Sequence, residues 1–256
     1  SFPRTKLCGG LFTGRSATYF REVFGECLPK IHLLEQRDVS FWYDGEPLAL
    51  MHDVPPLSLT MRWDLDHDIY QRVIAAGATD FTGCAIGALD LERRCVTLKD
   101  GRRLTYEVLI AGDGVNSMVA KALWGASFDR RKIGFGLEIE APKGAGPAHD
   151  AVRIDFAAAR WGYGWTFPKG RTTTIGVGGL LAENADFKAV LGRYLRHLQV
   201  DPDITPYKGH FIPFGDYRKR PGQGAIVLCG DAAGLVDPIT GEGIAYAIKS
   251  GALAAD

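Results

Sequence analysis

Two glycine corners that each carry an aspartate, and that each follow a short apolar run, constrain this chain more than any other feature. The run Glu107 to Ala111 leads into Gly112-Asp113-Gly114, and the run Ala225 to Cys229 leads into Gly230-Asp231. Short continuous apolar runs are typical of buried parallel strands, and glycine lets the backbone turn sharply and approach a ligand closely. An acid in such a turn can accept hydrogen bonds from ribose hydroxyls. The pattern therefore indicates a nucleotide-binding α/β unit.

The second corner is followed by the glycine-rich stretch Thr240 to Ile244, where the next helix is expected to begin. Free N–H groups at a helix N-terminus point at anions, so a pyrophosphate fits there. Taken singly, each corner is explained equally well by an ordinary strand, turn and helix, with Asn116 or Ser117 capping the helix after the first corner. Two such corners on either side of a β-rich segment are harder to explain in that way.

The segment between the corners differs in character from its flanks. β-Branched and aromatic residues separated by glycine and proline predict strands over 133–140, 151–156, 164–167 and 172–178. Amphipathic spacing then predicts a helix over 187–198.

The flanks carry the signals of an α/β unit. They predict a helix over 65–76 that ends at Gly77, a hairpin of strands 94–98 and 103–106, and a helix that starts near residue 243. The order is therefore α/β, then a mostly antiparallel sheet, then α/β again. That order predicts one nucleotide-binding domain interrupted by a substrate domain.

Composition excludes several classes of function. Lys+Arg and Asp+Glu both number 30 among 256 residues, so the sequence offers no excess of basic residues for nucleic-acid phosphates. No apolar run reaches the roughly 18 residues of a membrane span. The five cysteines form no CxxC pair and the six histidines show no metal spacing, so we expect free thiols, a cytoplasmic protein and no metal site.

The most specific motifs are Arg4-Thr5-Lys6-Leu7-Cys8-Gly9-Gly10 and Tyr163-Gly164-Trp165-Thr166-Phe167-Pro168-Lys169. The first resembles the R-x-K-x-C-G-G segment of the geranylgeranyl reductase family. The second is similar to that family's Y-x-W-x-F-P-K motif, which lines the substrate cavity. Asp113 and Asp231 are similar to the acids of the DG and GD motifs of flavoprotein hydroxylase-type enzymes. The resemblance spans almost the whole chain.

The resemblance implies FAD as the cofactor and an α/β fold with an α+β insertion, in which a glutathione-reductase-like FAD-binding domain is interrupted by a mostly antiparallel β-sheet substrate domain. We expect the FAD-binding domain in 1–52, 61–130 and 216–256, and the substrate domain in 131–215. The cofactor-binding residues that it implies are Arg4, Cys8, Gly9, Gly10, Arg62, Ala85, Asp113, Asp231, Gly241, Gly243 and Ile244. The substrate-binding residues that it implies are Tyr163, Trp165, Phe167 and Lys169.

Some of these residues have plain structural alternatives. Cys8, which the resemblance puts beside the flavin ring, is the candidate catalytic residue, because a thiol there could relay a proton or form a redox pair. Buried cysteines, however, usually pack as inert small hydrophobes. The aromatic residues of the second motif alternate at strand period, so they share one face of the strand with Trp161. This face forms either part of the core or the wall of an apolar cavity for a prenyl chain. Lys169 is either solvated or meets a phosphate headgroup.

The chain also departs from the family pattern. The family begins with a strand and G-x-G-x-x-G, followed by a strand that ends in an acid for the adenosine ribose, and this sequence has neither. Because a βαβ unit takes about 30 residues, we expect about that many before Ser1 and a continuation beyond Asp256. Without that unit, the chain as given is expected to bind FAD poorly.

The activity that the resemblance implies is reduction of isolated C=C bonds in a polyprenyl chain by hydride transfer from FAD. The expected partners are a prenyl-lipid or other apolar small molecule and an electron donor, either NAD(P)H or ferredoxin. A peripheral contact with the membrane stays open, and no nucleic acid is expected.

Three alternatives remain: an FAD-dependent monooxygenase or halogenase, a quinone-linked electron-transfer dehydrogenase, and a non-catalytic lipid-binding flavin fold. Halogenases share the DG and GD motifs and carry a related Trp-x-Trp-x-Ile-Pro stretch. The sequence Cys8-Gly9-Gly10 favours the reductases.

Overall fold

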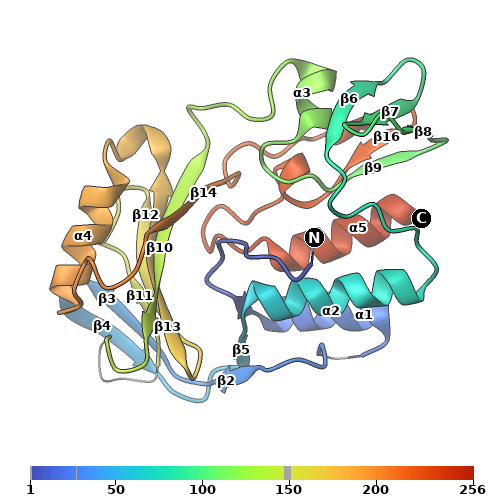
Figure 1. Cartoon of the computed structure of the whole chain (residues 1–256). Coiled ribbons are helices and arrows are strands. Elements are labelled where there is room, and N and C mark those ends of the chain that lie inside the picture. Colours follow the sequence, from blue (N-terminus) through green and yellow to red (C-terminus); the bar gives the residue numbers. More distant parts are fainter. Residues whose placement is uncertain (1, 27, 147–150) are drawn as a thin grey trace.

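The structure, a computed structural model, describes residues 2–26, 28–146 and 151–256. Figure 1 shows two halves, one built on a large sheet and the other on long helices with small sheets above them. The N-terminal segment runs between the halves, so its residues can contact both.

A seven-stranded sheet forms the first half. Its strands are β3 (Val39–Tyr43), β4 (Glu46–Met51), β10 (Gly134–Pro142), β11 (Val152–Asp155), β12 (Gly162–Pro168), β13 (Thr172–Leu180) and β14 (Lys208–Ile212). Their order in space is β14-β10-β13-β12-β11-β3-β4, and all neighbours are antiparallel except the parallel pair β11 and β3.

Helix α4 (Phe187–His197) covers the outer face of this sheet (Figure 1). It begins at Asp186, whose carboxylate accepts a 3.0 Å hydrogen bond from the Ala189 N–H. Alternate residues of a strand point to the same face, so the helix buries every second residue of β10 and β13. The buried core includes Leu137, Ile139, Ile175, Val177, Leu191 and Leu195. Residues of the opposite parity, such as Glu138, therefore face the second half.

Three helices pack together in the second half: α1 (Gly14–Phe24), α2 (Arg62–Ala75) and α5 (Ile244–Ala255). Their shared core joins residues that are distant in the sequence, namely Phe12, Phe20, Leu65, Ile69, Ile244 and Ile248. The Thr13 hydroxyl caps α1 by accepting from the Ser16 N–H, and Gly25, at φ 73°, ends it.

Small sheets complete the second half. The first contains β1 (Leu11–Phe12), β5 (Leu57–Leu59) and β2 (Leu34–Gln36), in that order. The second contains β15 (Gly222–Gln223), β16 (Ile226–Leu228) and β9 (Leu109–Ala111). The third contains β6 (Ile86–Asp90), β7 (Cys95–Leu98) and β8 (Arg103–Thr105). The short helix α3 (Met118–Trp124) follows β9, and 3₁₀ turns occupy Leu181–Glu183 and Gly230–Ala233.

The predicted α/β fold with a mostly antiparallel insertion is confirmed. All four strands predicted in the insertion are present as β10 to β13, and the predicted hairpin is β7–β8. Helix α4 lies where the periodicity placed it, and α5 begins at Ile244, next to the predicted start near residue 243. The helix predicted over 65–76 begins three residues earlier, at Arg62, which therefore lies in its first turn. The four cysteines within the described ranges, Cys8, Cys84, Cys95 and Cys229, are free.

Two expectations differ from the structure. Residues 39–51, which the domain division left with the FAD-binding part, form β3 and β4 of the large sheet, because Val39 to Trp42 pair with β11. Trp161 does not join the aromatic face of β12. It precedes the strand, its φ of 49° breaks the extended backbone, and its side chain is 78% exposed.

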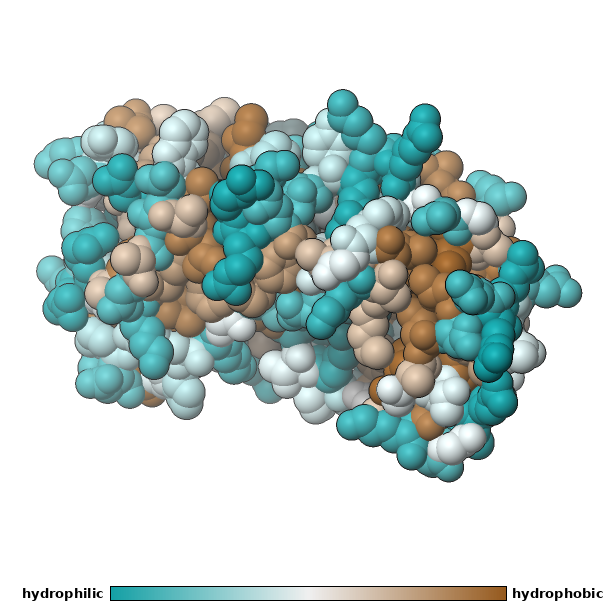
Figure 2. Space-filling view, turned by 90° about the horizontal axis from the view of Figure 1, so that it is seen from above, coloured by the Kyte–Doolittle hydropathy of each residue, from teal (hydrophilic) through white to brown (hydrophobic). Residues whose placement is uncertain are grey.

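Apolar surface is exposed near β9, as Figure 2 shows on the right of the view from above. The exposed apolar side chains of this part include Ile86, Val108, Ile110 and Met118. In the parts of the chain that the structure describes, no helix is both long and apolar enough to cross a membrane.

Candidate functional site

The two aspartate-bearing corners lie side by side because the strands before them are parallel neighbours. Ala111 at the end of β9 pairs with Leu228 at the end of β16. Asp113 and Asp231 therefore both follow the carboxyl ends of adjacent strands, where ligands bind in open α/β sheets.

Asp113 stabilises its own corner. Its Oδ2 accepts hydrogen bonds from the N–H groups of Met118 at 2.7 Å and Val119 at 3.4 Å, at the start of α3. The Ser117 hydroxyl caps the same helix by accepting from Ala120 at 2.9 Å. The hydrogen bonds to the start of α3 thus occupy one of the two carboxylate oxygens of Asp113, Oδ2.

A cleft of about 640 Å³ borders the first corner. It is lined by residues 4–7 of the N-terminal segment, 112–116 of the first corner and 208–210 of β14. Lys6 lines this cleft and also reaches the second corner, where its Nζ lies 3.2 Å from Oδ2 of Asp231. Lys6 therefore connects the lining of this cleft to the second corner.

The start of α5 is left open toward this region. Its N-cap residue, Gly243, provides no side-chain hydrogen bond to the helix, so the first N–H groups have no capping side chain. A Cβ atom at Gly243 would lie 3.4 Å from Oδ1 of Asp231, which shows how near the second acid is. Gly241, at φ 70°, adopts a backbone conformation that other residues rarely take.

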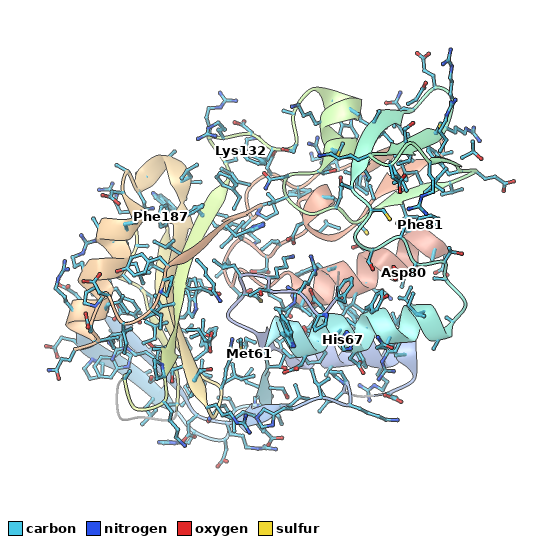
Figure 3. The ribbon with its side chains drawn as sticks, viewed as in Figure 1. Met61, His67, Asp80, Phe81, Lys132 and Phe187 are labelled. Carbon is cyan, nitrogen blue, oxygen red and sulfur yellow. The ribbon has the colours of Figure 1, made fainter. Side chains whose placement is uncertain are left out.

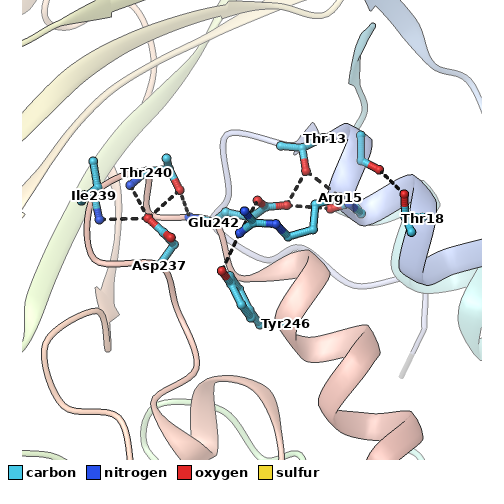
Figure 4. A network of polar contacts seen from close by, with 10 residues as sticks. Thr13, Arg15, Thr18, Asp237, Ile239, Thr240, Glu242 and Tyr246 are labelled. Atoms are coloured by element: carbon cyan, nitrogen blue, oxygen red, sulfur yellow. Dashed lines mark hydrogen bonds and ion pairs between the residues drawn. The ribbon is translucent and has the colours of Figure 1, made fainter. Parts of the chain in front are cut away.

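Glu242 holds the glycine-rich turn in place (Figure 4). Its Oε1 accepts hydrogen bonds from the hydroxyls of Thr13 at 2.5 Å and Ser16 at 3.0 Å, at the start of α1. Its Oε2 lies 4.0 Å from Arg15, whose guanidinium also donates to the Tyr246 hydroxyl. One carboxylate thus ties the start of α5 to the start of α1.

The Cys8-Gly9-Gly10 loop lies between the two halves. The Cys8 N–H donates to Oε1 of Glu138 at 3.1 Å, and the Gly10 N–H contacts the Cys8 thiol at 3.3 Å. Gly10 is required here, because its φ is 76° and a Cβ atom would lie 2.0 Å from the Thr60 carbonyl. The loop is therefore attached to the large sheet and packed tightly on the strand before α2.

Arg62 also reaches this loop. Its guanidinium binds Asp66 at 2.6 Å, and Arg4 binds the same carboxylate at 2.7 Å. Burial lowers the pKa of Arg62, but the nearby Cys8 and Asp66 raise it, and the net shift is upward. Arg4 and Arg62 thus share one buried acid, and Cys8 lies close to Arg62.

The aromatic residues of β12 line the face opposite α4. Trp165 and Phe167 are 6% and 7% exposed, and Phe167 lies against Gly9, where a Cβ atom would be 2.7 Å from its ring. The Tyr163 hydroxyl donates to the Thr240 carbonyl in the glycine-rich turn. Burial and then the nearby Cys8 raise the pKa of Tyr163 to about 12, so this hydroxyl stays a donor. The strand therefore contacts both the Cys8 loop and the start of α5.

Lys169 is buried, so its interpretation as a solvated lysine is wrong, whereas its contact with a phosphate headgroup stays a prediction. Its side chain is 4% exposed, and its Nζ lies 3.6 Å from Oε2 of Glu140 and 3.4 Å from the Met61 sulfur. Figure 3 shows Met61 at the end of α2 that faces the large sheet. Lys169 is thus buried between the halves.

The structure brings most of the candidates together but not all of them. The N-terminal motif, the two acids, the start of α5 and the aromatic strand surround one region. Ala85 lies elsewhere: it precedes β6, is exposed, and its carbonyl accepts from the Lys99 N–H. Two polar residues of this region, Lys6 and Glu242, were not singled out from the sequence as ligands.

The residues present fit part of a flavin dinucleotide. Two buried polar atoms beside the Cys8 loop, Trp165 Nε1 and Glu138 Oε2, have no protein partner in the described residues. The uncapped start of α5 offers N–H donors to an anion. Beside it, the Asp231 carboxylate can accept a hydrogen bond from a ligand hydroxyl group. Donors, acceptors and an apolar wall thus meet at the same place.

Comparison with known proteins agrees with this arrangement. No family model matches the chain. The geranylgeranyl diphosphate reductase of Rhodobacter capsulatus is 31% identical over 268 residues, which cover 99% of this chain and 66% of that protein. The chain belongs to the geranylgeranyl reductase family of FAD-dependent oxidoreductases. The resemblance, the cofactor FAD and the enzyme class predicted from the motifs are thereby confirmed.

The chain is also similar to other proteins and solved structures. The menaquinone reductase of Mycolicibacterium smegmatis is 27% identical over all of this chain and 68% of its own length, so the chain spans about two thirds of these relatives. A geranylgeranyl bacteriochlorophyll reductase-like protein from Thermoplasma acidophilum superposes with a TM-score of 0.79 at 20% identity, over 99% of this chain and 68% of that one. The flavin-dependent brominase Bmp2 superposes with a TM-score of 0.70 at 16% identity, covering 97% and 68%.

Proposed function

We propose that this member of the geranylgeranyl reductase family reduces isolated C=C bonds in a prenyl chain. The observation that carries this proposal is the contact between an aromatic wall and the predicted flavin-side loop: Phe167 and Trp165 lie directly against Gly9. If an apolar substrate lies along this wall, its C=C bond would lie next to the Cys8-Gly9-Gly10 loop. Relatives named geranylgeranyl diphosphate reductase support the same substrate class.

An isolated alkene has little charge for an enzyme to grip, so positioning must supply most of the rate enhancement. Buried aromatic side chains suit that task, because they hold an apolar chain by area and exclude water. When bound, FAD supplies the hydride. The protein's own residues orient the chain, keep water out and provide a proton for the second carbon.

The site residues take the following roles in this proposal. Asp231, kept in place by Lys6, and the open start of α5 bind the cofactor. The Cys8 loop lies beside the flavin ring, and Arg62 supports that loop from α2. The wall of Tyr163, Trp165 and Phe167 binds the substrate. The division into FAD-binding and substrate domains is part of the same proposal, with residues 39–51 now in the substrate sheet.

The test is anaerobic incubation of the full-length, chemically reduced protein with geranylgeranyl diphosphate, followed by mass spectrometry. A gain of two hydrogens per reduced bond is expected. Titration of the oxidised enzyme with NADPH and with reduced ferredoxin then identifies the donor. No mass gain with any prenyl substrate would refute the proposal.

A quinone is the second candidate, because relatives over the whole chain are named menaquinone reductase. Menaquinone should be assayed beside geranylgeranyl diphosphate, and the product treated with a mild oxidant. Hydrogens added to the quinone ring are lost on oxidation, whereas hydrogens added to the prenyl tail remain. Oxygen uptake coupled to NADPH would instead favour the monooxygenase or halogenase alternative.

A further inference from the structure

Glu138 is a buried acid that the roles above leave unused. It lies in the middle of β10, on the face turned away from α4, and is only 5% exposed. Carboxylates are rarely buried without partners, because loss of hydration penalises the charged form. Its presence on a buried face of β10 therefore calls for a reason.

The two oxygens of Glu138 differ in their contacts. Oε1 accepts the Cys8 N–H at 3.1 Å, whereas Oε2 is buried and has no hydrogen-bond partner among the described residues. Burying a charged carboxylate oxygen without a donor costs more free energy than burying the neutral acid. The contacts thus favour a neutral acid with its proton on Oε2.

Charged or titratable groups face Glu138 from several of the elements packed around it, whereas β13 brings only Gly176, which pairs with Glu138. Lys169 follows β12, Lys208 lies on β14, Glu140 is two residues further along β10, and Cys8 belongs to the N-terminal loop. Lys169 is itself engaged by Glu140 at 3.6 Å, so it does not form a close ion pair with Glu138. Burial raises the pKa of Glu138 to about 7, with Lys169 lowering it against this effect.

We propose that Glu138 stores the proton that the reaction at this site consumes, and that its bond to the Cys8 amide fixes the Cys8 loop in position. The first part rests on the proposed alkene reduction. One alkene carbon accepts a hydride from reduced FAD, and its neighbour accepts the proton of Glu138. The Oε2–H bond breaks as the second C–H bond forms, and the remaining carboxylate regains its proton from water. A general acid works best when its pKa lies near the working pH.

Infrared spectroscopy of the purified protein tests the proton store without any substrate. We expect the band of a protonated carboxyl group below about pH 7, which fades as the pH rises through that value. Glu138→Gln removes this band, because glutamine keeps the shape and the acceptor for the Cys8 N–H but cannot titrate. Glu140→Gln, two residues away on the same face, keeps the band but moves its midpoint to lower pH, because the Glu140 charge helps to raise the pKa of Glu138. Persistence of the band in Glu138→Gln would overturn the proposal.

Rapid-mixing kinetics test whether Glu138 delivers its proton to the substrate. In the wild type, reoxidation of the reduced flavin by a prenyl substrate is expected to slow as the pH rises above the pKa of Glu138. Glu138→Gln slows this step by about a hundredfold and abolishes its pH dependence, as loss of a general acid does. Glu138→Asp restores part of the rate and keeps a pH-dependent step, which serves if the glutamine variant folds poorly.

The outcomes separate this proposal from the proposed function. If the wild type reduces no prenyl substrate while the titrating band depends on Glu138, the proposed function is wrong, but the finding that Glu138 holds a proton stands. If the wild type reduces the substrate and Glu138→Gln does so equally fast, the proton store fails alone.

Discussion

The indole ring of Trp165 occupies the space that a side chain at Gly176 would need. A Cβ atom on Gly176 would lie 2.3 Å from Cζ2 of that ring. The neighbouring Gly178 lies against the same ring, where a Cβ atom would be 3.2 Å from Cζ3. The absence of side chains at Gly176 and Gly178 is therefore what lets the large aromatic residue lie across the face of the sheet.

Gly176→Ala is expected to destabilise the protein by about 1–3 kcal/mol, because overpacking forces the tryptophan or the strand to move. Urea unfolding followed by tryptophan fluorescence measures the change. Gly14→Ala is the control: nothing lies within 4 Å of its Cβ position at the start of α1, so no loss is expected. Equal stability of Gly176→Ala and the wild type would show that Trp165 packs elsewhere.

Glu138 makes stability depend on pH in a direction opposite to most carboxylates. Its pKa is about 7 in the folded protein against 4.5 as a model value, so between these values the folded state binds more protons than the unfolded state. Stability contributed by this group is complete below 4.5 and falls as the pH rises toward 7, by up to about 3 kcal/mol in total.

The Glu138→Gln variant should therefore gain stability relative to the wild type as the pH rises through this interval, and then keep a constant difference. Urea unfolding of both proteins across the interval checks the sign. A free energy of unfolding of Glu138→Gln that falls relative to that of the wild type as the pH rises would contradict the raised pKa of Glu138.

Glu242→Gln is expected to loosen the start of α5. The neutral amide can still accept a hydrogen bond but loses the charge that faces Arg15 and the two hydroxyls of α1 (Figure 4). Loss of charged hydrogen bonds predicts a cost of about 1.5–3 kcal/mol, measurable by thermal unfolding. Flavin should also dissociate more readily, which gel filtration and flavin absorbance would detect. Glu46→Gln, at an exposed position on β4, is the control.

Tyr163→Phe removes the hydrogen bond between the large sheet and the Thr240 carbonyl. The bond is expected to contribute about 1 kcal/mol, so flavin affinity should fall about fivefold if the turn must be held in place to bind the cofactor. Fluorescence titration of the apoprotein with FAD measures this. Tyr217→Phe, whose side chain is 62% exposed, should leave affinity unchanged.

Local signals predicted much of the fold. The strand from 133 to 140 and the helix from 187 to 198 were recognisable because their apolar residues repeat with the period of the element that they form. The corners at Asp113 and Asp231 were recognisable because glycine and an acid directly follow a short apolar strand. Such patterns require only that neighbouring residues share one environment.

Local signals failed where a residue's environment comes from a distant segment. Alternation in β10 would normally place Glu138 on a solvent-facing side, but the N-terminal loop, 130 residues away, covers that side and buries it. Lys169 ends an apolar strand and resembles a solvated lysine, yet it is enclosed between Met61 and Glu140.

By itself, the sequence determined the secondary structure of the insertion, the two acid corners and the family to which the chain belongs. Only the tertiary structure decided which polar groups are buried, how residues 39–51 extend the large sheet, and that the Cys8 loop is bonded to Glu138. The physical reason is that the burial and the pKa of a group depend on every atom around it. In this protein those atoms come from segments that are far apart in the sequence, such as the Cys8 loop and β10.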